Sequence, residues 1–558
     1  MAYVITQACC NDASCVSVCP VNCIHPTPDE PEFATTEMLY IDPQTCIDCG
    51  ACVEECPVNA IFDEGELSDK HSVYPEINAE YFDKHPIGPD WPEMKSLIAL
   101  DPAAGALTVA IVGSGPAACY AAAELADLRN VQVNIFDRLP TPYGLARAGV
   151  APDHPGTKAV TDVFHATLSK PSVDCYFNVE VGEHITHHEL LERHHAVIYA
   201  VGAASARRLG IPGEDLPGSH AVTEFVAWYN GHPDYSDRIF DLTGETAVIV
   251  GNGNVALDVA RVLLTDPDEL TKTDIADHAL EALRHSNIRE VIIVGRRGPA
   301  QAAYTNPELI ALGQMDDVDI IVDPVEAVLD PTTQAWVDGP NSELSHRLKV
   351  RQAESFSRLS ETGASKRIVL RYLASPETIL GNDHVEGVQL VRNELVPDSR
   401  GSLAARPTNH RETLETNLVL RSIGYRGRPV AGLPFDEARG IIPNEDGRVV
   451  DPSTGIGVAG VYVAGWIKRG PSGVIGTNKY CSASTVEALL EDFSTGLLAA
   501  PNAQGDDIRA TIVARRPEFV DFDGWQRIDT RERALGVPQG RPRTKVTNLD
   551  AILAIAHQ

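Results

Sequence analysis

Four cysteines in one tight run constrain this chain more than any other feature. They are Cys46, Cys49, Cys52 and Cys56, and Pro57 follows the last of them. The pattern C-x2-C-x2-C-x3-C-P binds iron–sulfur clusters, with three thiolates on one cluster and the fourth on a second one. Zinc sites seldom use four cysteines packed so densely and followed by proline. The run therefore predicts two iron–sulfur sites.

The same run occurs a second time, in altered form, 37 positions earlier. Asp12 stands there in the place of a cysteine. By crossed ligation, one [4Fe–4S] cluster is expected on Cys19, Cys46, Cys49 and Cys52, and the second cluster on Cys9, Cys15 and Cys56. A carboxylate is a harder and weaker ligand for this iron than a thiolate, so the second cluster is expected to be [3Fe–4S]. Three alternatives remain: a [4Fe–4S] type for the second cluster, Cys10 in place of Cys9 as a ligand, and Cys23 as a fourth thiolate.

The charge of the chain argues against some classes of partner. The net charge is −32, and residues 1–66 hold twelve Asp or Glu and neither Lys nor Arg. Such acidity disfavours nucleic acid and anionic membranes. It suits an electron carrier that docks on a basic patch of a partner. The alternative is acidity that only keeps the protein in solution, which would by itself account for the −20 carried by the rest of the chain. Neither an 18-residue apolar run nor a signal peptide is evident, so we expect no membrane insertion and a cytoplasmic location.

The first nucleotide-binding motif lies in residues 107–126. A β-branched strand leads into Gly113-x-Gly115-x-x-Ala118 and then into an alanine-rich helix. The glycines permit a tight turn and let a pyrophosphate approach the helix N-terminus. The next strand ends in Asp137, where an acidic residue can accept hydrogen bonds from a ribose.

A second motif of the same kind lies in residues 245–264, with Gly251, Gly253 and Ala256. Its following strand ends in Arg296 and Arg297 where an acid would otherwise stand. Arginine at this place suits a 2′-phosphate and favours NADPH over NADH. A solvated pair of arginines at a strand end is the alternative.

These patterns predict an α/β protein with two Rossmann-like nucleotide-binding domains, preceded by a small α+β bacterial ferredoxin-like domain. The expected division is a ferredoxin domain at 1–65, a linker at 66–104, a discontinuous FAD-binding domain at 105–205 and 425–499, an NADP-binding domain at 206–424, and a C-terminal surface extension at 500–558.

Residues from about 105 to 495 resemble the adrenodoxin reductase type of ferredoxin–NADP reductase, and especially bacterial members with a fused N-terminal ferredoxin. The matching segments are VGSGPAA (112–118), LPTPYGLARAGVAPDHPGTK (139–158), GNGNVALDVAR (251–261), GRRGP (295–299) and AGWIKRGPSGVIGTNK (464–479). The resemblance implies FAD on the first motif and NADP(H) on the second.

The resemblance also implies individual roles. For FAD, beside Gly113 and Gly115, it implies Ala117, Asp137, Leu145, Val179, Trp466, Gly473, Val474 and Ile475. For NADP it implies Asn252, Gly253, Asn254, Val255, Arg296, Arg297 and Glu308. His154 and Glu308 match residues of the family's active site. A structural loop histidine and a core aromatic are the alternatives for His154 and Trp466.

The combination of sites has a chemical logic. NADPH gives two electrons as one hydride, an iron–sulfur cluster accepts one electron at a time, and a flavin can do both. We therefore expect a ferredoxin–NADP(+) reductase that passes electrons from NADPH through FAD to its own clusters. The outside acceptor would be a redox protein such as a ferredoxin, a monooxygenase or another Fe–S protein. The alternatives are a redox-sensing or docking protein and another NADPH-dependent flavoprotein reductase. A disulfide reductase would need a redox cysteine pair, and Cys119, Cys175 and Cys481 have no close partner in sequence.

Overall fold

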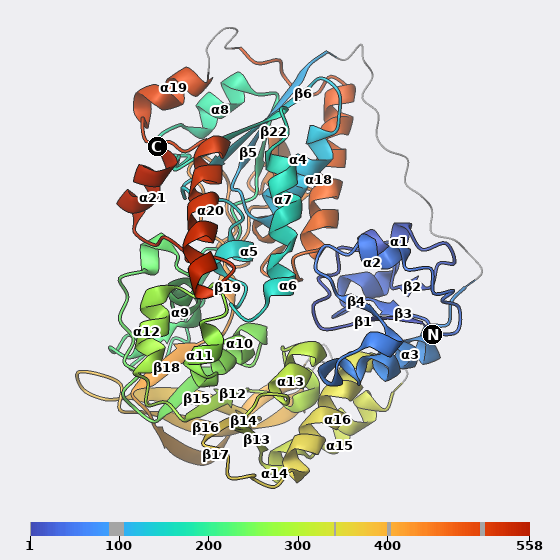
Figure 1. Cartoon of the computed structure of the whole chain (residues 1–558), viewed down its shortest axis with the longest axis vertical. Coiled ribbons are helices and arrows are strands. Elements are labelled where there is room, and N and C mark those ends of the chain that lie inside the picture. The colour runs from blue at the N-terminus through green and yellow to red at the C-terminus, as the bar shows by residue number, and fades with distance from the viewer. Residues whose placement is uncertain (1, 89–104, 340–341, 399–402, 503–507) are drawn as a thin grey trace.

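Two lobes stand one above the other, and a small N-terminal unit lies against both (Figure 1). The structure is a computed structural model that describes residues 2–88, 105–339, 342–398, 403–502 and 508–558. Among these residues, none of the helices has the length and apolarity needed to span a lipid bilayer.

The N-terminal unit is built from two short antiparallel strand pairs and two one-turn helices. Strand β1 (Tyr3–Ile5) pairs with β4 (Ile61–Asp63), and β2 (Ile24–His25) pairs with β3 (Tyr40–Ile41). Helices α1 (Ser14–Ser17) and α2 (Ala51–Glu54) each follow one cysteine loop. This is the small α+β domain that the duplicated cysteine run predicts.

A helix covers this unit where the sequence suggests only a linker. Helix α3 (Tyr74–Lys84) buries Tyr74, Ile77 and Tyr81. The buried Asn78 accepts hydrogen bonds from the amides of Ile5 (3.2 Å) and Ile41 (2.9 Å), which ties β1 to β3. The first part of residues 66–104 is therefore an ordered part of the unit, whereas residues 89–104 lie outside the described residues.

The first lobe is a seven-stranded sheet with a parallel core. Its order is β20 (Asn444–Glu445), β21 (Arg448–Asp451), β22 (Ile456–Val463), β8 (Ala196–Tyr199), β5 (Leu107–Val112), β6 (Val131–Asp137) and β7 (Val173–Phe177). Its helices are α4 (Pro116–Ala126), α5 (Leu145–Ala148), α6 (Pro155–Lys158), α7 (Val160–Leu168), α8 (His187–Arg193), α17 (Trp466–Arg469) and α18 (Thr477–Ser494). Strands β5, β6, β7, β8 and β22 pair in parallel, as expected when β-strands and helices alternate.

The second lobe is a fully parallel six-stranded sheet with a small antiparallel sheet beside it. The parallel order is β10 (Ser219–Ala221), β18 (Leu418–Arg421), β11 (Thr246–Val250), β12 (Glu290–Val294), β14 (Lys366–Arg371) and β13 (Val318–Val322). The antiparallel sheet holds β15 (Ala374–Leu380), β16 (Gly387–Pro397) and β17 (Leu403–Glu415). The helices are α9 (Val222–Tyr229), α10 (Asn254–Leu264), α11 (Pro267–Leu270), α12 (Asp277–Arg284), α13 (Asn306–Leu312), α14 (Pro324–Ala327), α15 (Pro331–Val337) and α16 (Leu344–Arg358).

The chain crosses between the lobes on two strands that pair with each other. Strand β9 (Ser205–Ala206) leaves the first lobe, and β19 (Tyr425–Arg426) returns to it antiparallel to β9. The second lobe is thus inserted between β8 and β20 of the first.

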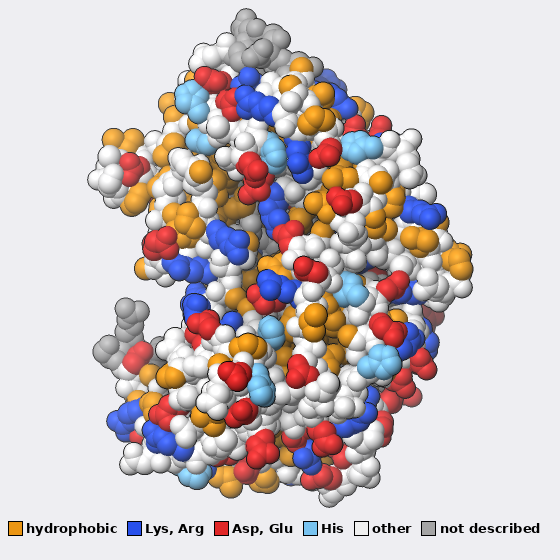
Figure 2. Space-filling view, turned by 90° about the vertical axis from the view of Figure 1, so that its left-hand side faces the viewer, with side chains coloured by type: hydrophobic (Ala, Val, Ile, Leu, Met, Phe, Trp, Pro, Cys, Tyr) orange, Lys and Arg blue, Asp and Glu red, His pale blue; other side chains and the backbone are white. Residues whose placement is uncertain are grey.

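The last segment, expected to be only a surface extension, contributes side chains to the core of the first lobe. Helices α19 (Ile508–Arg515), α20 (Phe522–Gly536) and α21 (Leu549–Ala556) lie on the first lobe, with Trp525 and Ile528 of α20 buried in its core (Figure 1). The chain then reaches the second lobe, where Arg541 donates to the carbonyl of Thr273 at 3.0 Å. Figure 2 shows the face opposite the N-terminal unit, where Lys and Arg gather around the middle, at the height at which the lobes meet.

Candidate functional site

The cysteine loops bring thiols together across the two halves of the N-terminal unit. Cys19 from the first half lines one cavity with Cys46, Cys49 and Cys52 from the second. The residues of this cavity include the set expected from crossed ligation, and none of these cysteines is in a disulfide. Cys23 lines the same cavity, with its Sγ 3.4 Å from the Sγ of Cys19.

The other half forms a second group of thiols. Cys9 and Cys15 each lie within electrostatic range of Cys56 and of Asp12. The Asp12 carboxylate accepts a hydrogen bond from the Ser14 hydroxyl at 2.6 Å. Cys10 is buried in the core of the first lobe, and it too lies within electrostatic range of Cys9, Cys56 and Asp12. Cys9, Cys15, Cys56 and Asp12 thus lie together, as a cluster with three cysteine ligands would need, and Cys10 lies beside them.

The first glycine motif leaves no room for side chains. A Cβ on Gly113, which has φ 103°, would meet the Ala200 carbonyl oxygen at 2.5 Å. A Cβ on Gly144 would meet the Cα of Gly115 at 2.9 Å. The loop before α4 is therefore bare backbone at a helix N-terminus, which fits a pyrophosphate. Apolar Leu145 follows Gly144 and is partly exposed.

Asp137 ends β6 directly beside this loop. Its carboxylate accepts hydrogen bonds from the amide of Ser114 (2.8 Å), the hydroxyl of Ser114 (2.6 Å) and the amide of Leu139 (2.9 Å). Burial raises the pKa of Asp137, and these hydrogen bonds act against that rise. The amide of Val179 donates to the Asp137 carbonyl at 2.8 Å, and the Val179 side chain is buried in the core.

The segment 464–482 packs against the helix that follows the first glycine motif. A Cβ on Gly465 would meet the Cβ of Ala117 at 2.6 Å, and the Ser482 hydroxyl donates to the Ala117 carbonyl at 2.8 Å. Trp466 is half-buried; its indole donates to the Ser472 carbonyl at 3.1 Å. Gly473 is exposed, and Val474 and Ile475 are half-buried. These residues therefore present backbone and apolar groups near the first glycine motif.

The second glycine motif repeats the geometry of the first. Gly251 has φ 113°, and a Cβ there would collide with the carbonyl oxygen of Ser422. Gly253 precedes α10, and Asn254 at the start of that helix accepts a hydrogen bond from the Thr305 amide at 2.7 Å. A Cβ on Gly295 would collide with the amide of Asn252, whereas Val255 is half-buried.

The two arginines of this lobe face outward from the end of β12. Arg296 is exposed and Arg297 is half-buried. Among the described residues, neither guanidinium makes an ion pair or a side-chain hydrogen bond. Burial and the neighbouring Arg296 lower the pKa of Arg297. An anion placed here would find two unpaired guanidinium groups, which suits a 2′-phosphate.

His154 and Glu308, far apart in sequence, are in contact. The Nε2 of His154 lies 3.2 Å from the Oε1 of Glu308, and its Nδ1 lies 2.9 Å from the Oδ1 of Asp153. Burial alone would lower the pKa of His154, but hydrogen bonds to Asp153 and Glu308 raise it to about 10. Burial would raise the pKa of Glu308, but Arg261 and His154 hold it at about 2. At neutral pH a charged imidazolium thus bridges two carboxylates.

Arg261 completes this group, and the sequence did not single it out. From helix α10 it donates to Asp153 at 2.9 Å, to Glu308 at 2.8 Å and to Asp258 at 2.7 Å. The donor atoms of His154, Asp258 and Glu308 are close enough together to hold a metal ion. The guanidinium and the imidazolium already neutralise these carboxylates, so the group fits an ion-pair network better than a cation site. An arginine on the buried face of a helix was the available signal.

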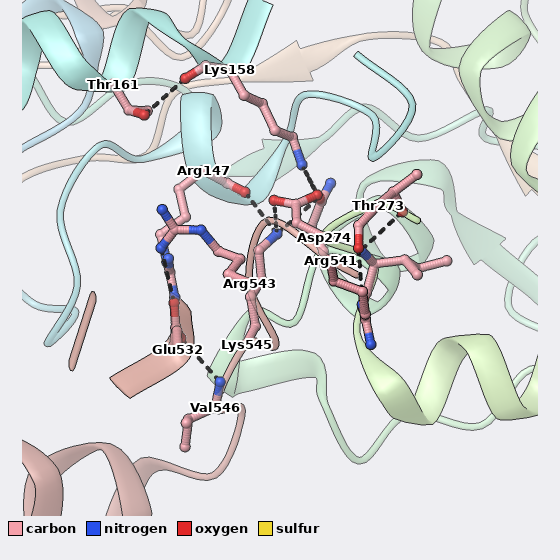
Figure 3. Close-up of polar contacts among 12 residues, drawn as sticks. Arg147, Lys158, Thr161, Thr273, Asp274, Glu532, Arg541, Arg543, Lys545 and Val546 are labelled. Atoms are coloured by element: carbon pink, nitrogen blue, oxygen red, sulfur yellow. Dashed lines mark hydrogen bonds and ion pairs between the residues drawn. The ribbon is translucent and has the colours of Figure 1, made fainter. Parts of the chain in front are cut away.

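Three parts of the chain meet around Asp274 (Figure 3). Lys158 of α6 and Lys545 of the C-terminal segment bind the same carboxylate, Asp274 of the second lobe, at 2.5 Å and 2.9 Å. Nearby, Glu532 of α20 pairs with Arg147 at 2.6 Å. Because α6 begins directly after His154, these contacts fix the position of the histidine loop relative to the second lobe.

The N-terminal unit packs closely on the first lobe. The amide of Gly476 donates to the Cys10 carbonyl at 2.8 Å, and a Cβ on Gly476 would collide with the backbone of residues 10–12. Lys479 donates to the Ser14 hydroxyl at 2.8 Å and lies 3.7 Å from Asp12. Val58 and Ala60 are buried in a core shared with this lobe, and Cys9 and Cys56 pack against that core.

The unit also binds the second lobe through carboxylates. Glu37 pairs with Lys349 at 2.8 Å and accepts a hydrogen bond from the Asn306 amide at 2.7 Å. Glu80 pairs with Arg351 at 2.5 Å. Since Asn306 opens helix α13, which carries Glu308, the unit touches the element that presents the candidate active-site acid.

Comparisons with known proteins agree with this arrangement. Residues 107–292 match the family of pyridine nucleotide-disulphide oxidoreductases, and residues 39–62 match the 4Fe-4S binding domain. The chain is 48% identical over 565 residues to a probable ferredoxin/ferredoxin–NADP reductase of Mycobacterium leprae, covering 100% of this chain and 98% of that protein. A protein of the same description from Mycobacterium tuberculosis strain H37Rv is 50% identical over 568 residues, covering 100% and 95%. The solved structure of Mycobacterium tuberculosis FprA in complex with NADPH superimposes with a TM-score of 0.76 at 46% identity, covering 81% of this chain and 100% of that one.

Proposed function

The chain belongs to the family of ferredoxin–NADP reductases that carry a fused ferredoxin, and we propose that it oxidises NADPH and delivers the electrons to an external redox protein through its own N-terminal unit. It is an oxidoreductase with FAD and NADP(H) as the nucleotides of its two lobes. Each NADPH would supply two electrons to two one-electron acceptors, with release of NADP+ and one proton.

One observation carries this proposal: the N-terminal unit packs directly on the loop expected to lie beside the flavin. Gly476, one residue beyond Gly473–Ile475, contacts the backbone of residues 10–12. A sensor that docks elsewhere has no need of such a contact. When bound, FAD would accept a hydride and give electrons up singly, and the clusters would accept them one at a time.

The residues on the two lobes fit their nucleotides. We assign FAD binding to the loop of Gly113 and Gly115 and to Asp137. The other FAD residues that the resemblance implies would lie around them. We assign NADP(H) to Asn252–Val255 and to the arginine pair. The unpaired guanidinium groups of Arg296 and Arg297 supply the positive charge that a 2′-phosphate requires.

We assign nicotinamide placement to His154 and Glu308. The proton on His154 Nε2 is shared with Glu308 Oε1, and Arg261 holds the other oxygen of Glu308. Both groups therefore keep one orientation and one protonation state near neutral pH. Such a fixed pair can orient a substrate ring at little entropic cost.

The two thiol groups differ in what they can hold. We assign a [4Fe–4S] cluster to Cys19, Cys46, Cys49 and Cys52, and a [3Fe–4S] cluster to Cys9, Cys15 and Cys56. Asp12 is bound by Ser14 and Lys479, which leaves its carboxylate occupied by the protein. Cys23 is then a neighbouring thiol of the first cluster, and Cys10 belongs to the interface.

Anaerobic titration with NADPH, followed by absorbance and electron paramagnetic resonance, tests the proposal. We expect flavin bleaching together with reduction of iron–sulfur signals, and a [3Fe–4S] resonance in the oxidised protein. Eight irons without that resonance would contradict the cluster assignment. Flavin reduction that never reaches the clusters would contradict the function.

A further inference from the structure

The two cysteine sites of the N-terminal unit differ in what covers them. Cys9 and Cys56 pack against the core of the first lobe, so the three-cysteine site lies toward the reductase. Cys49 of the four-cysteine site is exposed, and the side chain of Ile47 is 59% exposed. An outside protein can therefore approach the four-cysteine site more closely than the three-cysteine site.

We propose that the outer edge of the four-cysteine site, formed by Tyr3, Ile47, Cys49, Asp48, Asp63 and Glu66, is the docking surface for a redox protein that carries lysine and arginine around its own electron-accepting centre. This inference rests on the proposed function, because it takes the four-cysteine site to hold a cluster. We call these residues the outer edge.

The outer edge has an apolar centre with carboxylates around it. Tyr3, Ile47 and Cys49 line the cavity of the four-cysteine site, and the Tyr3 hydroxyl lies 3.1 Å from a Cβ position on Gly50. Asp48 stands between Ile47 and Cys49 in the chain, Asp63 pairs with Tyr3 across β1 and β4, and Glu66 follows three residues later. An apolar contact inside a polar rim is the usual anatomy of a protein interface.

The carboxylates of the outer edge have no ion-pair partner within the described part of the chain. Asp12, Glu37 and Glu80 pair with Lys479, Lys349 and Arg351 of the reductase lobes. In contrast, no ion pair is formed by Asp48, Asp63 or Glu66 among the described residues, and neither Lys nor Arg occurs before Lys70. Unpaired carboxylates around an apolar contact complement a basic partner and speed its approach.

The test is made on the full holoprotein with cytochrome c, a lysine-rich one-electron acceptor, as the probe. The outer-edge variant carries Asp48→Asn and Asp63→Asn. The matched control carries Glu76→Gln and Asp83→Asn, which removes the same charge beside Arg351 on another face of the unit. Ferricyanide, a small anion, serves as a second acceptor that needs no docking surface.

We expect the outer-edge variant to raise the KM for cytochrome c roughly three- to tenfold at low ionic strength, with a smaller effect in high salt. The control variant and all ferricyanide rates should stay near those of the unmodified protein. Ile47→Gln should give a smaller rise. A carbodiimide, which joins carboxylates to lysines, should cross-link cytochrome c to Asp48, Asp63 or Glu66.

Equal losses in both variants, an unchanged KM in the outer-edge variant, or cross-links confined to other carboxylates would overturn the inference. Failure of the proposed function looks different: NADPH would then reduce ferricyanide but not cytochrome c, even in the unmodified protein. The cross-linking needs no turnover, so it decides the docking surface in that case too.

Discussion

The two halves of the N-terminal unit have nearly the same backbone and different surroundings. Positive φ angles recur 37 positions apart, at Asn11 and Asp48 (56° and 58°) and at Asn22 and Asn59 (49° and 51°). The amide four residues after the last cysteine of each run bonds to its sulfur, from Cys23 to Cys19 at 3.4 Å and from Ala60 to Cys56 at 3.2 Å. The duplication has thus kept the loop that shapes a cluster site.

What differs is the position where aspartate replaces cysteine. Asp12 is buried against the first lobe and lies near Lys479, whereas Cys49, its counterpart, is exposed. The two nucleotide motifs show the same contrast: equivalent glycines have φ 103° and 113°, but one second strand ends in Asp137 and the other in an arginine pair. Repeated backbone therefore serves different ligands through a few side chains at equivalent positions.

The largest expected effect tests the contrast between the nucleotide motifs. Changing Arg296 and Arg297 to alanine should raise the KM for NADPH by about one to two decades, because a charge-assisted contact to the 2′-phosphate contributes about 1.5–3 kcal/mol. The KM for NADH should change little. Steady-state kinetics with both cofactors measures the difference, and equal losses would refute the assignment.

The substitution with the next largest expected effect breaks the contact between the first half of the N-terminal unit and the first lobe. Gly476→Val would push a side chain into the backbone of residues 10–12, and such overpacking costs about 1–3 kcal/mol. We expect NADPH-driven reduction of the clusters to slow about tenfold while reduction of ferricyanide persists. Stopped-flow absorbance separates the two, and Ser472→Ala, at an exposed position of the same loop, is the comparison. Unimpaired cluster reduction would show that this contact is dispensable.

The active-site pair should titrate at high pH. Since the pKa of His154 is raised to about 10, its proton is held below that value and lost above it. The stability contributed by the proton on His154 should therefore be complete below about pH 6.5, the ordinary value, and disappear as pH rises through 10. Flavin reduction by NADPH should be flat from about pH 7 to 9 and fall above. His154→Ala should still bind FAD but lose this dependence; an unchanged rate, or loss of flavin, would contradict the role.

The substitution with the smallest expected effect makes the two halves of the N-terminal unit alike. Asp12→Cys should convert the [3Fe–4S] centre to [4Fe–4S] and raise the iron content from about seven to about eight atoms per chain. Iron analysis and the loss of the [3Fe–4S] resonance in anaerobically purified protein measure this. Asp48→Cys, at the outer edge, is the control and should leave the iron content unchanged.

Sequence predicted those parts of the molecule that depend on local spacing. Cysteines three residues apart and glycines before a helix determine their own geometry, and the structure brings together Cys19 with the second run as expected. Contacts between distant elements were not predictable. For Arg261 the sequence offers only an arginine on the buried face of a helix, which does not name its partners, and α3 was hidden by the prolines around it. The interface at Gly476 depends on how two domains pack, which no local pattern records.

The ion pairs Glu37–Lys349 and Glu80–Arg351 join the N-terminal unit to the second lobe. Their strength decides whether the unit would stay bound if it were a separate protein. Glu80–Arg351 is partly exposed, and such a pair contributes only about 0.2–1 kcal/mol. Glu37–Lys349 is buried, where the cost of removing both charges from water offsets most of their attraction. Together they are too weak to hold a free ferredoxin at cellular levels. A covalent connection raises the effective concentration of the unit to the order of millimolar, so weak contacts are enough. Transfer within the chain should accordingly be first-order, with a rate that does not change on dilution of the protein. A diffusing ferredoxin would then be a recipient from this protein rather than a competitor for its flavin.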